Sequence, residues 1–132
     1  MTNSEKEQQE LMFKLSMFEQ QIKAVQEQLQ AVEEAIVEAG SLKLSLDDLK
    51  GGKEKEIFAG IGKGIFIKAK ITSENLVVDV GGKNFVKKTI SETQKIIEEQ
   101  VKKLEDIKED LEKKLEEINN ELTKVFMSAQ KE

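Results

Sequence analysis

Apolar residues recur at alternating steps of four and three along the first part of the chain, separated mostly by Glu, Gln and Lys. This heptad spacing places the apolar residues on one stripe of a helix, and it does not fit the two-residue period of a β-strand. It predicts a coiled-coil helix over residues 8–50, with a change of phase near Gly40 and an end at Gly51-Gly52. The residues of this first seam are Leu11, Leu15, Phe18, Ile22, Val25, Leu29, Val32, Ile36 and Ala39.

The last part of the chain repeats the pattern and predicts a second coiled-coil helix over residues 91–128. Lys108 occupies one position of this second seam, and we expect the neighbouring Ile107 to cover the gap. The apolar residues of the second seam are Ile97, Val101, Leu104, Leu111, Leu115, Ile118, Leu122 and Val125.

Two overlapping capping boxes mark the start of the second helix. One pairs Thr89 with Glu92, and the other pairs Ser91 with Gln94. In each, a hydroxyl and a longer polar side chain three residues later accept hydrogen bonds from backbone amides at the helix start. These amides have no partner within the helix.

Neither helix is expected to stand alone, because a narrow apolar stripe needs a facing stripe. The two predicted helices are similar in length, so an antiparallel pair within one molecule is the favoured arrangement. A parallel dimer is the alternative, and it would require the intervening region to hold the two helices of each chain far apart.

Residues 54–89 predict strands. Residues 65–71 alternate between an aliphatic face and a face with Lys68 and Lys70, and short strands at 56–59, 76–80 and 85–88 complete two β-hairpins separated by turn residues. A region this small cannot bury a core of its own, and its free strand edges favour pairing with other chains. We therefore expect an oligomerisation surface, the assembly set: Ile57, Phe58, Ile65, Phe66, Ile67, Ile71, Val78, Val80, Phe85 and Val86.

The composition removes most catalytic chemistry. The 132 residues include no His, Cys, Pro, Trp or Tyr, and all 21 basic residues are lysine. Without imidazole, thiol or guanidinium groups the chain lacks the usual bases, nucleophiles, zinc ligands and phosphate forks. We expect no enzyme, no cofactor and no metal.

Charge and hydropathy also bound the location and the partners. The net charge is −5, with a basic middle segment between two acidic ones, and no apolar run approaches the roughly 18 residues that a membrane span needs. The chain gains nothing from an oxidising compartment because it has no cysteine. We expect a cytoplasmic protein that binds neither membrane nor nucleic acid.

One glycine-rich segment invites a nucleotide-binding interpretation. Residues 60–64 read GIGKG, but a phosphate loop lies between a strand and a helix, and here a strand follows. Turns and bulges between strands are the favoured interpretation. A nucleotide-dependent enzyme remains the third-ranked class, to be tested by calorimetry with ATP or GTP.

Large apolar residues gather at the two chain ends. Apart from Met1, every methionine lies there, together with three of the six phenylalanines. An antiparallel pair of helices brings residues 11–18 opposite residues 122–128, and the seam uses only part of this apolar surface. Flexible thioethers beside aromatic rings suit a surface that adapts to many partners; ordinary capping of the coiled coil, or fraying, is the alternative. The candidate client-binding residues, here called the tip cluster, are Leu11, Met12, Phe13, Leu15, Met17, Phe18, Leu122, Val125, Phe126 and Met127.

The strand region resembles the prefoldin alpha family. Residues 62–71 read GKGIFIKAKI, residues 78–82 read VDVGG and residues 86–89 read VKKT. The family has a Gly-x-Gly-x-Phe-x-Lys-Ala strand and a Val-Gly-x-Gly strand in its two hairpins. One departure is AGIG at residues 59–62, where the family often has Pro followed by Ile or Val and Gly.

The resemblance implies a mainly α fold with a small β region: a long antiparallel coiled-coil hairpin whose helices are joined by two β-hairpins that assemble into an oligomeric β-barrel platform. The whole chain would be a single prefoldin-like domain, residues 1–132, of archaeal type. It further implies a hexamer of two alpha and four beta subunits that holds unfolded or nascent proteins without ATP and delivers them to a group II chaperonin. The alternative is a filament-forming structural prefoldin-like protein.

Overall fold

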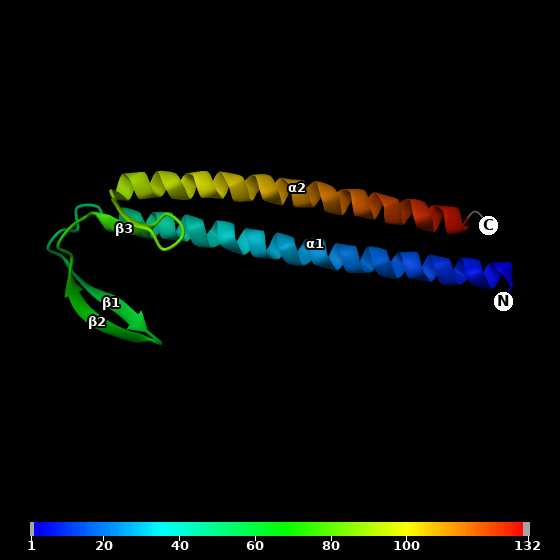
Figure 1. Ribbon diagram of the computed structural model, residues 1–132, viewed down its shortest axis with the longest axis horizontal. Helices are drawn as coiled ribbons and strands as arrows, with labels where there is room; N and C mark the ends of the chain where they lie inside the picture. Colours follow the sequence, from blue (N-terminus) through cyan, green and yellow to red (C-terminus); the bar gives the residue numbers. More distant parts are fainter. Residues whose placement is uncertain (1, 131–132) are drawn as a thin grey trace. The chain divides into compact units, whose positions relative to one another are not determined.

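The computed structural model describes residues 2–130 as two long helices joined by four strands (Figure 1). This order confirms the predicted helix, two hairpins, helix arrangement. The elements are α1 (Asn3–Asp47), β1 (Glu56–Gly62), β2 (Ile65–Lys70), β3 (Leu76–Asp79), β4 (Phe85–Lys88) and α2 (Ile90–Gln130).

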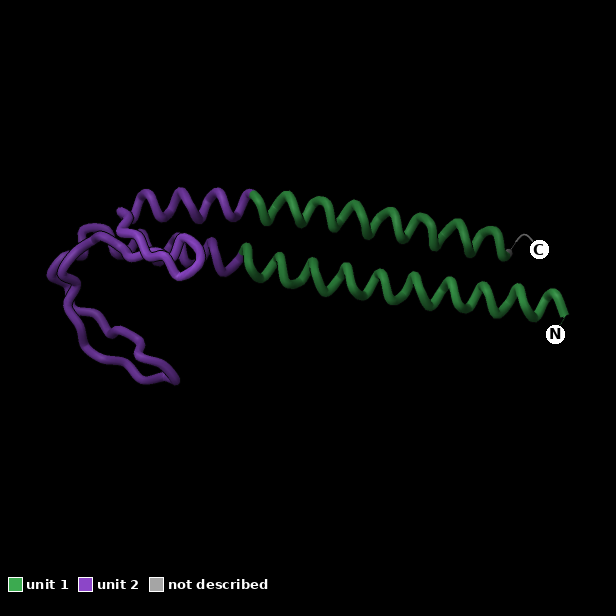
Figure 2. Tube along the Cα trace, viewed as in Figure 1, with its two compact units in different colours: residues 1–36, 103–132 green, residues 37–102 purple. Residues whose placement is uncertain are grey.

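The chain divides into two compact units, coloured separately in Figure 2. The first, here the leg unit, comprises residues 1–36 and 103–132, and the second, here the strand unit, comprises residues 37–102. The helices pass through both units, and the four strands belong to the strand unit.

In the leg unit the two helical segments lie side by side and run in opposite directions (Figure 1). Every predicted seam residue of this unit is buried or half-buried, and the most shielded are Val25, 3% exposed, and Ile118, 7% exposed. The two apolar stripes therefore shield each other within one molecule, which favours the antiparallel pair over the parallel dimer.

The gap in the second seam is filled differently from the prediction. Ile107 was expected to cover it, but its side chain stays 47% exposed. Lys108 occupies the position itself and reaches Glu33 of α1 at 3.7 Å and Glu112 at 3.9 Å. A long aliphatic stem lets lysine line the seam while its ammonium group stays near water and carboxylates. The prediction for Ile107 was wrong because it treated lysine only as a charge.

The strand unit has a small core where the helices meet the strands. Leu46 of α1 and Ile90 and Ile97 of α2 are buried together, with Leu76 of β3 packed against them. This contact ties the second hairpin to the helices. Half-buried apolar residues at Ala39, Leu49 and Val101 complete the cluster.

Helix α1 ends at Asp47, before the glycine pair that was expected to stop it. Successive turns carry the chain through residues 48–51 to Gly51, whose φ of 70° is readily adopted only by glycine. The next residue is tightly enclosed: a Cβ at Gly52 would lie 2.9 Å from the carbonyl oxygen of Leu49. The glycine pair thus shapes the exit from the helix.

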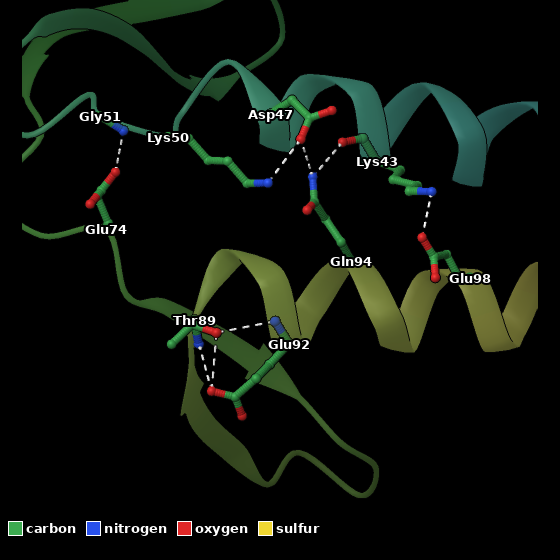
Figure 3. Close-up of polar contacts among 9 residues, drawn as sticks. All are labelled: Lys43, Asp47, Lys50, Gly51, Glu74, Thr89, Glu92, Gln94 and Glu98. Carbon is green, nitrogen blue, oxygen red and sulfur yellow. Dashed lines mark hydrogen bonds and ion pairs between the residues drawn. The ribbon is translucent and has the colours of Figure 1, made fainter.

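One of the two predicted capping boxes starts α2. The Glu92 amide donates to Thr89 Oγ1 at 3.1 Å, and the Thr89 amide donates to Glu92 Oε1 at 3.4 Å (Figure 3). The box proposed for Ser91 and Gln94 does not form. Instead, Gln94 points across to α1, because its side chain is buried there and needs partners.

The strands form two separate antiparallel sheets, β1–β2 and β3–β4. A β-bulge interrupts the first sheet between Gly60 and Gly62, and a two-residue turn with positive φ at Lys63 and Gly64 follows. The glycine-rich segment is therefore bulge and turn, as predicted, and β1 runs to Gly62 rather than stopping at Ala59. Each sheet leaves the outer edges of both its strands unpaired.

Candidate functional site

The tip cluster lies in the leg unit and divides into two sets by burial. Leu11, Leu15, Phe18, Leu122 and Val125 are half-buried and belong to the seam. The other five are largely exposed, namely Met12 (70%), Phe13 (67%), Met17 (45%), Phe126 (46%) and Met127 (58%). The seam is too narrow to cover them, so a substantial apolar surface faces water at these helix ends.

Two clefts open where the helices meet near this surface. One, of about 460 Å³, brings Met17 and Phe18 of α1 together with Val125 of α2. The other, of about 710 Å³, lies between Leu11 and Val125 and is lined mostly by polar side chains. Residues 11–18 therefore do lie opposite residues near 125, as the antiparallel arrangement predicted.

The clefts do not gather the whole tip cluster. Phe18 and Val125 form apolar walls, whereas Met12, Phe13 and Phe126 line neither cleft and present their side chains directly to water. The smaller cleft suits a side chain inserted between the helices. The exposed residues add apolar surface outside the clefts.

The polar walls of the clefts were not among the predicted site residues. Lys14, Gln21, Glu121 and Lys124 line the smaller cleft, and Lys14 and Lys124 line both. A search limited to apolar residues cannot find such positions. The heptad frame could have found two of them, because Lys14 and Gln21 are seven residues apart and flank the first seam.

The assembly set lies in the strand unit and remains mostly exposed. Phe58 is 74% exposed and Phe66 is 62% exposed, whereas Ile71 and Val78 are half-buried. Ile61 and Val77, which sequence analysis did not include, are exposed to a similar degree. Isolated two-stranded sheets are marginally stable in water, so these open edges and apolar faces favour cover by other chains.

A polar clasp joins the two helices inside the strand unit (Figure 3). Gln94 donates to the carbonyl oxygen of Lys43 at 3.2 Å and to Asp47 Oδ1 at 2.7 Å. Lys43 also pairs with Glu98 at 2.6 Å. These contacts come from both helices, so they fix the register in which α2 packs against the end of α1.

The clasp lowers two carboxyl pKa values. The hydrogen bond from Gln94, followed by that from Lys50, lowers the pKa of Asp47, and the contact with Lys43 lowers the pKa of Glu98. Both carboxylates are stabilised by donors placed against them, so both stay ionised to lower pH than free side chains.

Residues 2–130 contain neither a metal-binding cluster nor a membrane-spanning helix. No group of three or more acidic, histidine or cysteine side chains is arranged there to hold a metal ion. No helix in the same part of the chain is long and apolar enough to cross a bilayer.

The chain matches one known protein family over most of its length. The model of the family described as "Prefoldin subunit" matches residues 18–132, which include the whole strand unit with its four strands and the leg unit from residue 18 onward. The chain belongs to the prefoldin family, a family of chaperones.

The curated relatives specify the type of subunit. Prefoldin subunit alpha of Methanobrevibacter smithii is 31% identical over 94 residues, which are 70% of this chain and 64% of the relative. The alpha subunit of Methanosphaera stadtmanae is 21% identical over 68% of this chain and 65% of its own. That of Methanococcus aeolicus is 34% identical over 64% and 58%. The matched part thus spans less than two thirds of each relative's length, and the resemblance to archaeal prefoldin alpha subunits is confirmed.

A solved structure confirms the fold. The filamentous PFD of Methanocaldococcus jannaschii, determined by cryo-electron microscopy, superimposes with a TM-score of 0.79. The match covers 87% of this chain and 97% of that chain at 20% sequence identity. The two helices with four intervening strands are therefore the prefoldin fold.

Proposed function

We propose that this chain is the alpha-type subunit of an ATP-independent holdase that binds unfolded or nascent proteins through the tip cluster. The observation that carries the proposal is the exposure of five large apolar side chains at the helix ends, with Met12 and Phe13 about two-thirds exposed. Each such side chain left in water forgoes about 1.5–3 kcal/mol of burial. A client that covers several of them recovers that free energy.

The chemistry of the tip cluster suits clients of varied sequence. Methionine has three rotatable bonds and a polarisable sulfur, so it adapts to irregular apolar surfaces. Phenylalanine supplies a large rigid area. Each tip alone would bind weakly, and several tips on one assembly would hold a client by multivalency.

The proposed assembly is a hexamer of two alpha and four beta subunits, joined through the strand unit. Exposed apolar faces and unpaired edges on both sheets support this, because strand addition covers both. Family membership supports the remaining parts of the proposal: action in the cytoplasm, transfer of clients to a group II chaperonin, and no catalysis, nucleotide, nucleic acid or membrane.

The tip proposal is tested by replacing the five exposed residues together with serine: Met12, Phe13, Met17, Phe126 and Met127. The expected result is an assembly of unchanged mass that no longer suppresses aggregation of a chemically unfolded client. Leucine at the same five positions is the matched control, since it keeps the apolar surface and should keep most of the suppression. Full suppression by the serine variant would refute the tip assignment.

A second candidate is a filament-forming structural protein. Both sheets have open edges on both sides, so strand pairing can continue from chain to chain. The solved relative from M. jannaschii is itself described as filamentous. Mass measurement with and without a beta-type subunit separates the two candidates: a closed hexamer on mixing supports the holdase, and open-ended polymers without beta support the filament.

A further inference from the structure

The β1–β2 hairpin has two different apolar faces. Residues directly opposite each other share a face, so Ile57 with Ala69 and Ala59 with Ile67 form a wholly aliphatic one. The other face carries the pairs Glu56 with Lys70, Phe58 with Lys68 and Gly60 with Phe66. Closing a barrel uses one face and the strand edges. If the aliphatic face turns inward, Phe58 and Phe66 remain without cover.

Helix α1 carries a second apolar surface without a partner. Val37 is 70% exposed and Leu44 is 69% exposed. They are seven residues apart and share one side of the helix with Ser41 between them. Leu46 and Ala39 face the strand-unit core, so this stripe takes no part in the packing of α1 against α2.

The two surfaces have opposite charge. Residues 53–71, which include the hairpin, contain five lysines and two glutamates. Residues 37–48 contain three acidic residues and one lysine; Asp47 and Lys43 belong to the polar clasp with α2, which leaves Glu38 and Asp48 outside it. Like charge disfavours hairpin against hairpin and stripe against stripe, whereas opposite charge favours hairpin against stripe.

We propose that the Phe58 and Phe66 face of one copy docks on the Val37–Leu44 stripe of a second copy of this chain. Within a single copy both surfaces stay exposed, so the chain's own hairpin does not cover its own stripe. Opposite charge supplies attraction and orientation, and the apolar residues supply the area to bury. The proposal concerns assembly and does not depend on client binding at the tip cluster.

The absence of cysteine makes a direct test possible. One variant carries Ser41→Cys on the stripe and a second carries Lys68→Cys beside Phe58, and the two are mixed, assembled and mildly oxidised. The expected product is a disulfide-linked dimer of the two variants. A mixture of Lys102→Cys, on the exposed side of α2, with Lys68→Cys is the control.

Two outcomes of the cross-linking experiment would overturn the proposal. One is a yield of linked dimer no greater than that of the Lys102→Cys control. The other is a disulfide that forms within a single chain when both substitutions are placed on one molecule at high dilution. The second outcome would assign the stripe to the chain's own hairpin.

An independent test removes the stripe without disturbing the fold. Val37→Ser with Leu44→Ser changes only exposed side chains, so helical content should be unchanged while the dissociation constant of the assembly rises at least tenfold. Leu42→Ser is the control, since Leu42 is 53% exposed and lies off the stripe. An unchanged dissociation constant would contradict the docking. So would weakening seen only in mixtures with a beta-type subunit, which would assign the stripe to that partner.

Discussion

At the scale of single residues, two polar side chains set the alignment of the helices. Lys108 interrupts the second apolar seam and meets Glu33 of the facing segment. Gln94 is 8% exposed and donates hydrogen bonds to Lys43 and Asp47 of α1. A polar residue at a seam position sacrifices some stability and specifies register, because a shifted register would leave it without partners.

Replacing Lys108 with leucine should stabilise the chain by about 1 kcal/mol, since the gain from apolar contact in the seam exceeds the value of a partly exposed ion pair. Thermal unfolding at fixed protein concentration measures the change. Lys113→Leu is the control, because Lys113 is an exposed residue paired only with Glu109 at 3.4 Å. A lower melting temperature for Lys108→Leu than for the parent would show that the ion pair dominates.

Replacing Gln94 with alanine should raise the pKa of Asp47 towards its ordinary value and destabilise the fold by about 1 kcal/mol, because the hydrogen bonds from Gln94 to Asp47 and to the Lys43 carbonyl are lost. The pKa of Asp47 is depressed in the folded state, so its contribution is present above the ordinary pKa and is lost as pH falls towards the lowered one. Titration of Asp47 by carbon-detected NMR, with Gln100→Ala as the control, checks the shift. An unmoved pKa would assign the depression to Lys50.

At the scale of elements, the strongest local signals belong to the helices. The seam positions, the capping box at Thr89 and the bulge at the glycines were all predictable, because each follows from spacing along the chain. The choice of Thr89 over Ser91, the orientation of Gln94 and the exposure of Ile107 were not, because each depends on what the opposite helix offers. Likewise, Lys14 and Lys124 line a cleft that both helices form together, so neither position could be predicted from the spacing in one helix.

The capping assignment predicts a difference between two neighbouring hydroxyl residues. Thr89→Ala should cost about 1 kcal/mol of stability, because Thr89 accepts from the Glu92 amide at the helix start. Ser91→Ala should change stability by a few tenths at most, since Ser91 already lies inside the first turn of α2. Urea unfolding of both variants measures the two costs, and equal costs would contradict the assignment.

At the scale of the whole molecule, the exposed strands make the chain dependent on its partners. The strand unit buries only a few apolar residues, and most large apolar side chains of its two sheets face water. This much exposed apolar surface is unusual for a monomeric protein. Membership of the prefoldin family explains it, because subunits of this family assemble into oligomers.

Placing a charge on the aliphatic face of the first hairpin should therefore abolish assembly and spare the helices. Ile67→Lys is expected to reduce the mass in solution to that of the single chain, with helical circular dichroism retained, because a buried unpaired ammonium is costly. Thr72→Lys, at an exposed position between β2 and β3, is the control. An Ile67→Lys variant of full assembled mass would show that this face stays in water.

Phe18 and Val125 have two roles in the leg unit. The same two side chains belong to the seam and line the smaller cleft. Under the proposed function, a client side chain inserted there would compete with the packing of the two helices. A tightly bound client would weaken the packing of the helix ends, and tightly packed helix ends would bind clients weakly. Client affinity and coiled-coil stability near Phe18 would therefore be inversely related. A substitution that stabilises helix pairing near Phe18 would speed release of the client.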